Sequence, residues 1–266
     1  MILFPPAKIN LGLYVHRRRD DGYHEIESCM NEIPLFDALE ILPSNEFRFV
    51  QTGIRVDGEV SDNICVKAFR LIQHRFALPD VYIHLRKNIP VGAGLGGGSS
   101  DAAYVLKGVR SLFNLEVSDN VLEEMAAELG SDCAFFIKAG TQLSTGRGEV
   151  LTPIRIGLEG YFLKVVNPGL HVRTAEAYAE VELSSCEGGL TELLQQPVEN
   201  WKGRLHNSFE KSVFRKYPAL AAIKEKLYAE GASYALMSGS GSTVFGLFKN
   251  EPDLTFPDYF EKVMKL

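Results

Sequence analysis

The segment of this chain best suited to chemistry is glycine-rich and runs from residue 90 to residue 103 as PVGAGLGGGSSDAA. Five of the seven residues from Gly92 to Gly98 are glycines, although each glycine loses extra conformational entropy on folding. Glycines let consecutive backbone N–H groups approach a ligand closely and point into one concavity. Residues at helical spacing follow directly, so a helix N-terminus adds the positive end of its dipole. The segment therefore predicts a site for a di- or triphosphate, with a serine hydroxyl available to Mg²⁺.

Three phosphate-binding interpretations of this segment compete. Gly92, Gly94 and Gly97 satisfy the G-x-G-x-x-G pattern of dinucleotide-binding folds, and Glu116 follows about 20 residues later. That pattern has little specificity in a segment so rich in glycine. A Walker A loop is excluded because no Gly-Lys-Ser/Thr sequence follows. The third interpretation is a nucleotide-triphosphate loop of non-Walker type, and the alternative without function is a flexible glycine tract.

Lys8, Asn10 and Asp132 are candidates for acid–base or charge-stabilising chemistry. Asp132 lies among small and apolar residues in LGSDCAFF, where it suits a helix N-cap or a catalytic base kept ionised by a cation. Lys8 lies in an apolar stretch that predicts a strand, where a lysine usually extends from the surface into water. Asn10 shares its face because strand side chains repeat with period two. The pair predicts either a polar outer face or one wall of a polar pocket.

Aromatic residues and a second glycine-rich segment are further candidates. Tyr23 and His24, in the charged sequence RRRDDGYHE, suit stacking on a nucleobase, and the alternative is a solvated loop with a buried tyrosine. Tyr178, on a helix that Thr174 is expected to cap, suits core packing equally well. The sequence SGSGS at 238–242 predicts either a hairpin connection or a second anion-binding nest.

Composition narrows the class of protein. The 266 residues suggest one large domain or two modest ones, and 45% hydrophobic with 23% charged residues is typical of a globular protein. The net charge of −6 provides no general attraction to nucleic acid or anionic membranes, so local groups must hold any anionic substrate. No apolar run approaches the roughly 18 residues of a membrane span, and the first ten residues lack a basic signal-peptide region.

The cysteines indicate the compartment. They are widely spaced, without a C-x-x-C pair or a histidine at metal-ligand spacing, which favours free thiols in a reducing cytosol over zinc or disulfides. We therefore expect a cytoplasmic protein. The four residues are Cys29, Cys65, Cys133 and Cys186.

Segments of period two alternate with segments of helical period, which predicts a mixed α/β or α+β chain. A domain boundary is expected near residues 150–157. Helices are expected to begin after Asp62 or Asn63, after Ser118, after Thr174 and at Pro218. Strands are expected over 9–15, 38–42, 81–86, 161–166, 234–237 and 244–248.

Three motifs in chain order resemble the GHMP superfamily of small-molecule kinases, which includes galactokinase, homoserine kinase, mevalonate kinase and phosphomevalonate kinase. They are PAKINLGLYVHRRRDDGYHEIES at 6–28, NIPVGAGLGGGSSDAA at 88–103 and ALMSGSGSTVFGLF at 235–248. The resemblance implies an α+β, two-lobed GHMP kinase fold. Its N-terminal lobe, over 1–153, is expected to carry the ATP loop and a left-handed β-α-β unit, against the usual handedness. Its C-terminal lobe, over 154–266, is expected to be an α/β sandwich.

The first motif, with its K-I-N and D-G-Y-H elements, implies one activity within the superfamily. This activity is ATP-dependent phosphorylation of the 2-hydroxyl of 4-CDP-2-C-methyl-D-erythritol, in the non-mevalonate route to isoprenoid precursors. ATP and Mg²⁺ are the implied cofactors, the substrate is a small molecule, and no nucleic acid or membrane partner is expected. We expect a monomer or a weak homodimer.

Three other functions stay open from the residues. A kinase for another small alcohol, such as homoserine or a mevalonate-like compound, is disfavoured by Tyr23 and His24, because those substrates have no base to stack. A non-catalytic nucleotide sensor is disfavoured by the presence of both Lys8 and Asp132. A nicotinamide-dependent oxidoreductase is the third alternative.

The resemblance also implies roles for single residues. Lys8 and Asp132 resemble the catalytic pair, and Ser100 is a candidate magnesium ligand, with no acidic ligand evident. The contacts to the cytidyl substrate, in which Tyr23 and Tyr178 flank the cytosine, are expected to be Asn10, Tyr23, His24, Thr174 and Tyr178. The ATP-binding residues are expected to be Pro90, Val91, Gly92, Ala93, Gly94, Leu95, Gly96, Gly97, Gly98, Ser99 and Ser100, with Lys87 and Asn63 as weaker matches.

Overall fold

The computed structural model describes residues 1–266 and divides the chain into two compact units. The predicted lobe boundary at residues 153 and 154 falls within the second unit and stays a prediction. None of the helices combines the length and the apolar character that crossing a membrane requires. The first unit comprises Met1–Ala7, Leu35–Val91 and Gly96–Ala139, and the second comprises Lys8–Pro34, Gly92–Leu95 and Gly140–Leu266.

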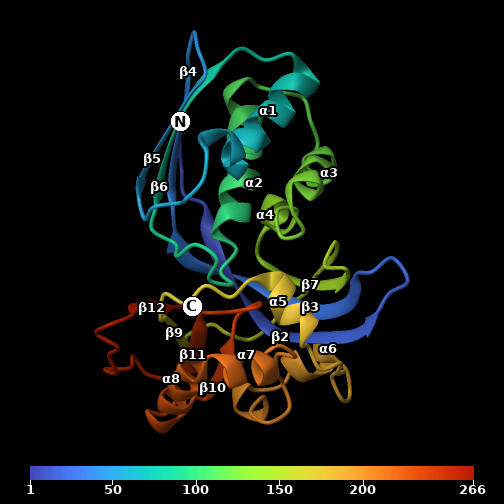
Figure 1. The fold of residues 1–266 in the computed structure, drawn as a ribbon, viewed down its shortest axis with the longest axis vertical. Coiled ribbons are helices and arrows are strands. Elements are labelled where there is room, and N and C mark those ends of the chain that lie inside the picture. Colours follow the sequence, from blue (N-terminus) through green and yellow to red (C-terminus); the bar gives the residue numbers. More distant parts are fainter. The chain divides into compact units, whose positions relative to one another are not determined.

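The first unit is a four-stranded sheet, in the order β1-β4-β6-β5, with helices on one face (Figure 1). Its parallel pair, β5 and β6, is connected through α1, which forms the β-α-β unit that the resemblance implied. The strands are β1 (Ile2–Leu3), β4 (Ala38–Pro43), β5 (Arg48–Gly53) and β6 (Val81–Lys87). The helices are η1 (Val60–Asp62), α1 (Ile64–Phe76), α2 (Gly97–Leu112), α3 (Asp119–Leu129) and α4 (Phe135–Lys138).

Side chains of this sheet alternate between its two faces. Ile83 and Leu85 of β6 are buried, whereas His84 between them is only half-buried. Leu39 and Ile41 of β4 are buried in the same way. This alternation arises because one face packs against α1 and α2 while the other faces water. The strands predicted over 38–42 and 81–86 are confirmed.

Two predicted helix caps are confirmed in the first unit. The Asn63 side chain accepts a hydrogen bond of 2.9 Å from the Cys65 N–H at the start of α1. The Ser118 hydroxyl accepts one of 3.5 Å from the Val121 N–H at the start of α3, and Gly130 follows its last residue. Both side chains satisfy N–H groups that have no partner within the helix.

The second unit contains two four-stranded sheets, in the orders β2-β3-β7-β8 and β10-β11-β9-β12. Helices α7 and α8 lie along the second of these sheets (Figure 1). The strands are β2 (Pro6–Arg18), β3 (His24–Phe36), β7 (Thr141–Gly146), β8 (Val150–Pro153), β9 (Phe162–Asn167), β10 (Tyr234–Met237), β11 (Val244–Phe248) and β12 (Phe260–Lys265). The helices are α5 (Thr174–Ala179), α6 (Leu190–Leu194), η2 (Val198–Asn200), α7 (Glu210–Lys216) and α8 (Pro218–Ala229).

One apolar core joins β2 to the second sheet and its helices. Burial of these side chains removes apolar surface from water, and this stabilises the position of β2 against the second sheet. The prediction that Thr174 caps a helix is wrong, because Arg173 occupies the N-cap position and Thr174 is the first residue of α5. The core includes Leu13, Val15, Val166, Phe209, Leu220, Leu227, Met237 and Val244.

Candidate functional site

Lys8 and Asn10 of β2 and Ser28 of β3 form a buried row of hydrogen-bonded polar side chains. The Lys8 ammonium donates a hydrogen bond of 2.6 Å to Asn10 Oδ1, and the two residues are 3% and 4% exposed. Asn10 Nδ2 donates to Ser28 Oγ on β3 at 2.8 Å, and that hydroxyl donates to the Gly12 carbonyl at 2.7 Å. The readings of Lys8 as a surface side chain, and of the pair as a polar outer face, are therefore wrong. A buried ammonium is costly unless polar groups surround it, and here Asn10 supplies such a group. The catalytic role of Lys8 stays a prediction.

Gly92–Leu95, the part of the glycine-rich segment that belongs to the second unit, is here called the first glycine loop, and it is hydrogen-bonded to this row. The Lys8 backbone N–H donates to the Leu95 carbonyl at 2.9 Å, and the Thr243 N–H donates to the Ala93 carbonyl at 3.1 Å. Gly94 has a φ of +78°, and a Cβ added to it would lie 2.1 Å from the Ser238 carbonyl oxygen. Only glycine therefore fits at position 94.

The SGSGS segment connects β10 to β11 and packs against the first glycine loop. The Asn10 N–H donates to Ser238 Oγ at 3.2 Å, and Ser238 Oγ donates to the Gly94 carbonyl at 2.8 Å. Asn207 Nδ2 donates to the Gly239 carbonyl at 2.7 Å from the other side. The hairpin interpretation of this segment is confirmed. Anion binding by this segment stays a prediction.

The first turn of α2 lies in the first unit and carries free donor groups. Gly96 precedes the helix with a φ of +69° and provides no side-chain cap. The helix is 16 residues long, so its N-terminus offers uncapped N–H groups and a positive dipole end to an anion. Ser100 is fully buried, and its hydroxyl has no hydrogen-bond partner. This orphaned hydroxyl fits a role as ligand to a phosphate or to Mg²⁺, although no group of three or more His, Cys, Asp or Glu residues forms a metal site.

A buried charge cluster lies directly behind this turn. The Lys87 ammonium donates to Asp37 Oδ2 and, at 2.7 Å, to Asp101 Oδ2, and the three residues are at most 3% exposed. Asp37 Oδ1 also accepts the N–H groups of Asn88 at 2.5 Å and Ile89 at 2.9 Å. Asp101 Oδ1 has no partner. The cluster thus fixes the end of β6 and the start of α2, the two segments that flank the glycine loop.

Protonation in the cluster follows from burial and charge. Burial and the nearby Asp37 carboxylate raise the pKa of Asp101 to about 8. Burial opposes the charge of Lys87, but Asp101 and Asp37 outweigh it, so the pKa of Lys87 rises. The ammonium therefore stays charged, and Asp101 is the member that takes up a proton. Because the ammonium of Lys87 is used within the cluster, its predicted contact with a nucleotide stays a prediction.

The structure gives the surroundings of two further predicted residues of the first unit. Asp132 does not cap a helix, because it lies in a turn and Ala134 is the N-cap of α4. The Asn63 side chain, besides capping α1, donates to Gln51 Oε1 at 3.3 Å. The roles of Asp132 in catalysis and of Asn63 in nucleotide binding stay predictions.

The predicted substrate residues of the second unit form two aromatic contacts. The His24 ring stacks on the Tyr178 ring, with centroids 4.8 Å apart and planes at 25°. Tyr23 is 58% exposed, so it is not a buried tyrosine, and the Arg147 guanidinium lies over its ring at 5.0 Å. Thr174 Oγ1 lies 3.3 Å from Ser240 Oγ, which links α5 to the SGSGS segment. The structure therefore pairs Tyr178 with His24, and a cytosine between Tyr23 and Tyr178 stays a prediction.

Sequence reasoning missed several residues of this region. Ser28 completes the buried row, but a serine in a strand gives no signal by itself. Arg147 lies in a turn between strands far from Tyr23 in the sequence. His171 lies against the first glycine loop, since a Cβ on Gly92 would be 2.7 Å from its Nδ1. Only the pairing of segments distant in the chain identifies these residues.

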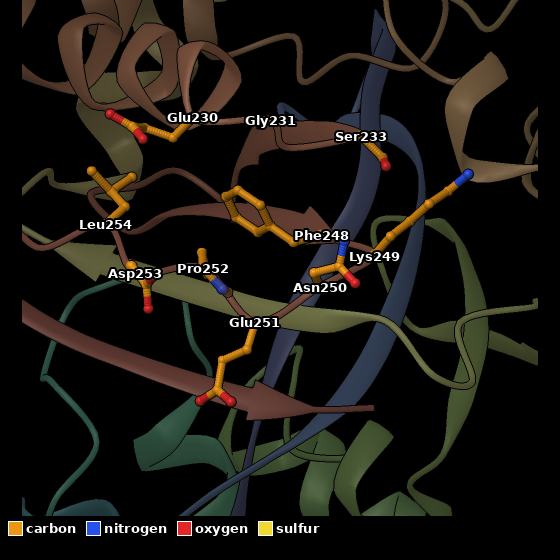
Figure 2. Close-up of a pocket in the computed structure, with 10 residues that line it drawn as sticks. All are labelled: Glu230, Gly231, Ser233, Phe248, Lys249, Asn250, Glu251, Pro252, Asp253 and Leu254. Atoms are coloured by element: carbon orange, nitrogen blue, oxygen red, sulfur yellow. The ribbon is translucent and has the colours of Figure 1, made fainter.

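A separate hollow of about 490 Å³ lies at the C-terminal end of β11 (Figure 2). Three carboxylates line it, and the Lys249 side chain extends away from them to pair with Glu199 at 2.7 Å. None of the predicted site residues belongs to it, and its acidic lining does not suit an anionic nucleotide. Its lining residues are Glu230, Gly231, Ser233, Phe248, Lys249, Asn250, Glu251, Pro252, Asp253 and Leu254.

Comparison with family models gives two matches. Residues 63–140 match the GHMP kinases N terminal domain, and residues 188–255 match the GHMP kinases C terminal model. The first match contains α1, α2 and the glycine loop, and the second contains α7, α8 and the SGSGS segment.

Curated relatives match almost the whole chain. A protein named 4-diphosphocytidyl-2-C-methyl-D-erythritol kinase, from Azobacteroides pseudotrichonymphae genomovar. CFP2, is 49% identical over 250 residues, which are 94% of each chain. A protein of the same name from Bacteroides fragilis (strain YCH46) is 48% identical over 263 residues, which are 97% of this chain and 96% of the relative.

Solved structures agree with these relatives. A crystal structure of 4-(cytidine 5′-diphospho)-2C-methyl-D-erythritol kinase superposes with a TM-score of 0.79 and 35% identity, covering 93% of this chain and 90% of the other. The homoserine kinase from Cytophaga hutchinsonii superposes with a TM-score of 0.72, covering 99% and 93% of the two chains. At 16% identity, the second match shows the fold alone.

Proposed function

Because the chain belongs to the 4-diphosphocytidyl-2-C-methyl-D-erythritol kinase family of the GHMP kinases, we propose that it transfers the γ-phosphoryl group of ATP to the 2-hydroxyl of 4-diphosphocytidyl-2-C-methyl-D-erythritol. The observation that carries this proposal is the 49% identity to a relative of that name over 94% of both chains. The buried row that begins at Lys8 supplies the chemical support, since it holds a buried ammonium on the strand whose backbone is hydrogen-bonded to the first glycine loop.

Phosphoryl transfer depends on positioning and charge stabilisation more than on covalent help from the protein. Lys8 suits this task because Asn10 holds its ammonium and the Leu95 carbonyl holds its backbone. An ammonium fixed in this way stabilises negative charge on the transferring phosphoryl group. We assign to Asp132 the role of accepting the proton of the substrate hydroxyl, on the strength of family membership.

The phosphates of ATP are proposed to bind at the first glycine loop and the first turn of α2. Uncapped N–H groups and the helix dipole favour the anionic oxygens there. The hydroxyl of Ser100, buried without a partner, is the group proposed to hold Mg²⁺. When bound, Mg²⁺ neutralises charge on the phosphate oxygens.

The cytidyl end of the substrate is proposed to bind at the aromatic residues of the second unit. Tyr23 offers an exposed ring, and the adjacent His24 is held by its stack on Tyr178. Nucleobases stack on such rings and hydrogen-bond through their edges. Asn10 and Thr174 are proposed to contact the remainder of the substrate.

We propose that the reaction takes place in the cytoplasm. Four free cysteines, three of them buried, suit the reducing cytoplasm. We propose a monomer or weak homodimer, which size-exclusion chromatography with light scattering measures directly.

The test is a coupled ADP-release assay with three acceptors and Mg²⁺. ADP release with the cytidyl substrate, and less than about 1% of that rate with homoserine or mevalonate, is the expected result. Activity confined to homoserine or mevalonate overturns the substrate assignment and leaves the family unchanged. Metal dependence is measured in the same assay by adding a chelator, with activity restored by Mg²⁺.

A further inference from the structure

The turn between β7 and β8 lies beside the start of β3. Ile26 of β3 pairs with Gly146, the last residue of β7, so the turn continues alongside the residues that precede Ile26. The Gly148 N–H donates to the Thr145 carbonyl at 3.1 Å, and Gly146 and Gly148 have φ values of +72° and +110°. These values favour glycine and produce a tight turn with Arg147 at its tip.

Arg147 and Tyr23 form a defined contact across these two segments. The guanidinium carbon lies 5.0 Å from the centre of the Tyr23 ring, within the range of a cation–π interaction. Glu149 holds the arginine, because its Oε2 accepts the Arg147 backbone N–H at 2.5 Å and its Oε1 lies 3.4 Å from Arg147 Nε. Tyr23 is anchored by its own N–H, which donates to Asp21 Oδ1 at 3.1 Å.

Tyr23 lies just before β3 begins, and 58% of its surface is exposed. A side chain in that position is free to rotate unless a neighbour restricts it. Its neighbour His24 is restricted by the stack on Tyr178. Arg147 supplies the corresponding restriction for Tyr23 from one face of the ring, and more than half of the residue stays exposed.

We propose that Arg147 is a positioning residue that orients Tyr23, so that the uncovered face of the ring receives a pyrimidine base. This inference rests on the proposed function, in which Tyr23 contacts the cytidyl substrate. Arg147 acts through the tyrosine and takes no part in phosphoryl transfer. A ring already held in its binding orientation loses less freedom when the base stacks on it, which strengthens binding.

The test compares Michaelis constants for the two substrates in Arg147→Ala and Arg147→Lys. We expect Arg147→Ala to raise the KM for the cytidyl substrate about 3- to 5-fold, with kcat and the KM for ATP within about twofold of wild type. Arg147→Lys retains a cation over the ring and recovers part of the loss. The matched control is Arg17→Ala, because Arg17 is exposed and pairs with Glu25 in the same region. We expect no change from the control.

A double-mutant cycle separates orientation of Tyr23 from a general effect of charge. In the Tyr23→Ala background, Arg147→Ala should raise the KM for the cytidyl substrate no further, because its effect passes through the ring. Additive effects, or a wild-type KM in Arg147→Ala, overturn the inference. A wild-type protein that releases no ADP with the cytidyl substrate overturns the proposed function instead. The same cycle, measured by calorimetric titration with cytidine 5′-diphosphate, then decides the role of Arg147: non-additive losses support it, and additive or absent losses refute it.

Discussion

The hydroxyl of Ser238 donates a hydrogen bond of 2.8 Å to the carbonyl oxygen of Gly94. This bond joins the two glycine-rich segments of the chain, which lie 144 residues apart in the sequence. The same hydroxyl accepts a hydrogen bond from the Asn10 N–H, so it also links both segments to the strand that carries Lys8. Within the second unit, the first glycine loop is thus held by specific hydrogen bonds as well as by its own glycines.

Gly94→Ala should therefore abolish the arrangement of the loop. The added Cβ would lie 2.1 Å from the Ser238 carbonyl oxygen, at a φ of +78° that is strained for alanine. We expect kcat/KM for ATP to fall by at least about 100-fold, because misplaced donors no longer stabilise the transferring charge. Steady-state kinetics measure the effect.

Gly157→Ala is the control for this change, since nothing lies within 4 Å of its added Cβ and its φ is not positive. It should leave kcat/KM within about twofold of wild type. Equal kinetics for Gly94→Ala and the control would show that the loop tolerates displacement.

Removing either member of the proposed catalytic pair should slow turnover without unfolding the protein. Lys8→Ala and Asp132→Asn should each lower kcat at least about 100-fold, the usual cost of losing a positioned acid–base or charge-stabilising group. Single-turnover measurements give the rate of phosphoryl transfer, and circular dichroism checks the fold. Turnover like that of the wild type in either variant removes that residue from the mechanism.

The charge cluster behind α2 should contribute to stability more than any surface ion pair. Lys87→Met leaves the buried Asp37 carboxylate beside Asp101 without a counter-ion and should lower the free energy of unfolding by about 3–5 kcal/mol. Lys67→Met, which breaks an exposed pair with Asp62, should cost less than about 1 kcal/mol. Urea denaturation of both variants measures the difference. Similar small losses in the two variants would mean that the Asp101 and Asp37 carboxyls are neutralised without Lys87.

Cysteine reactivity should distinguish one thiol from the other three. Burial raises the pKa of Cys29 to about 12 and that of Cys133 to about 11, and it raises the pKa of Cys65 well above its usual value. Cys186 is only half-buried, although burial raises its pKa as well. Because the thiolate is the reactive form, native protein at pH 8 should react with a disulfide reagent at Cys186 alone.

The pH dependence of this reaction has a definite sign. Below the raised pKa of Cys186, the thiolate fraction rises about tenfold per pH unit, so the rate of modification should rise in proportion from pH 7 to pH 8.5. All four thiols should react after unfolding. Mass spectrometry of the labelled peptides identifies the modified thiols. Rapid modification of Cys29, Cys65 or Cys133 in the native protein would show that the surrounding core opens readily.

The sequence alone determined features that depend on neighbours in the chain. The caps at Asn63 and Ser118, and the alternation along β6, follow from side chains within a few residues of one another. The same local logic placed Pro218 at the start of α8. It failed at Thr174, because a threonine before a short helix serves equally well as its first residue.

Only the tertiary structure decided which polar groups are buried together. Lys8 has the local pattern of a surface lysine, yet it is buried. Its backbone bonds to Leu95, and its partner Asn10 bonds to Ser28 and Ser238, all on other segments. The ion pairs of Lys87 likewise require Asp37, 50 residues away in the sequence. Desolvation and charge pairing are properties of the folded surroundings of a side chain. A linear pattern therefore predicts the residue types available for phosphate chemistry, and the fold determines their exposure, their partners and their protonation.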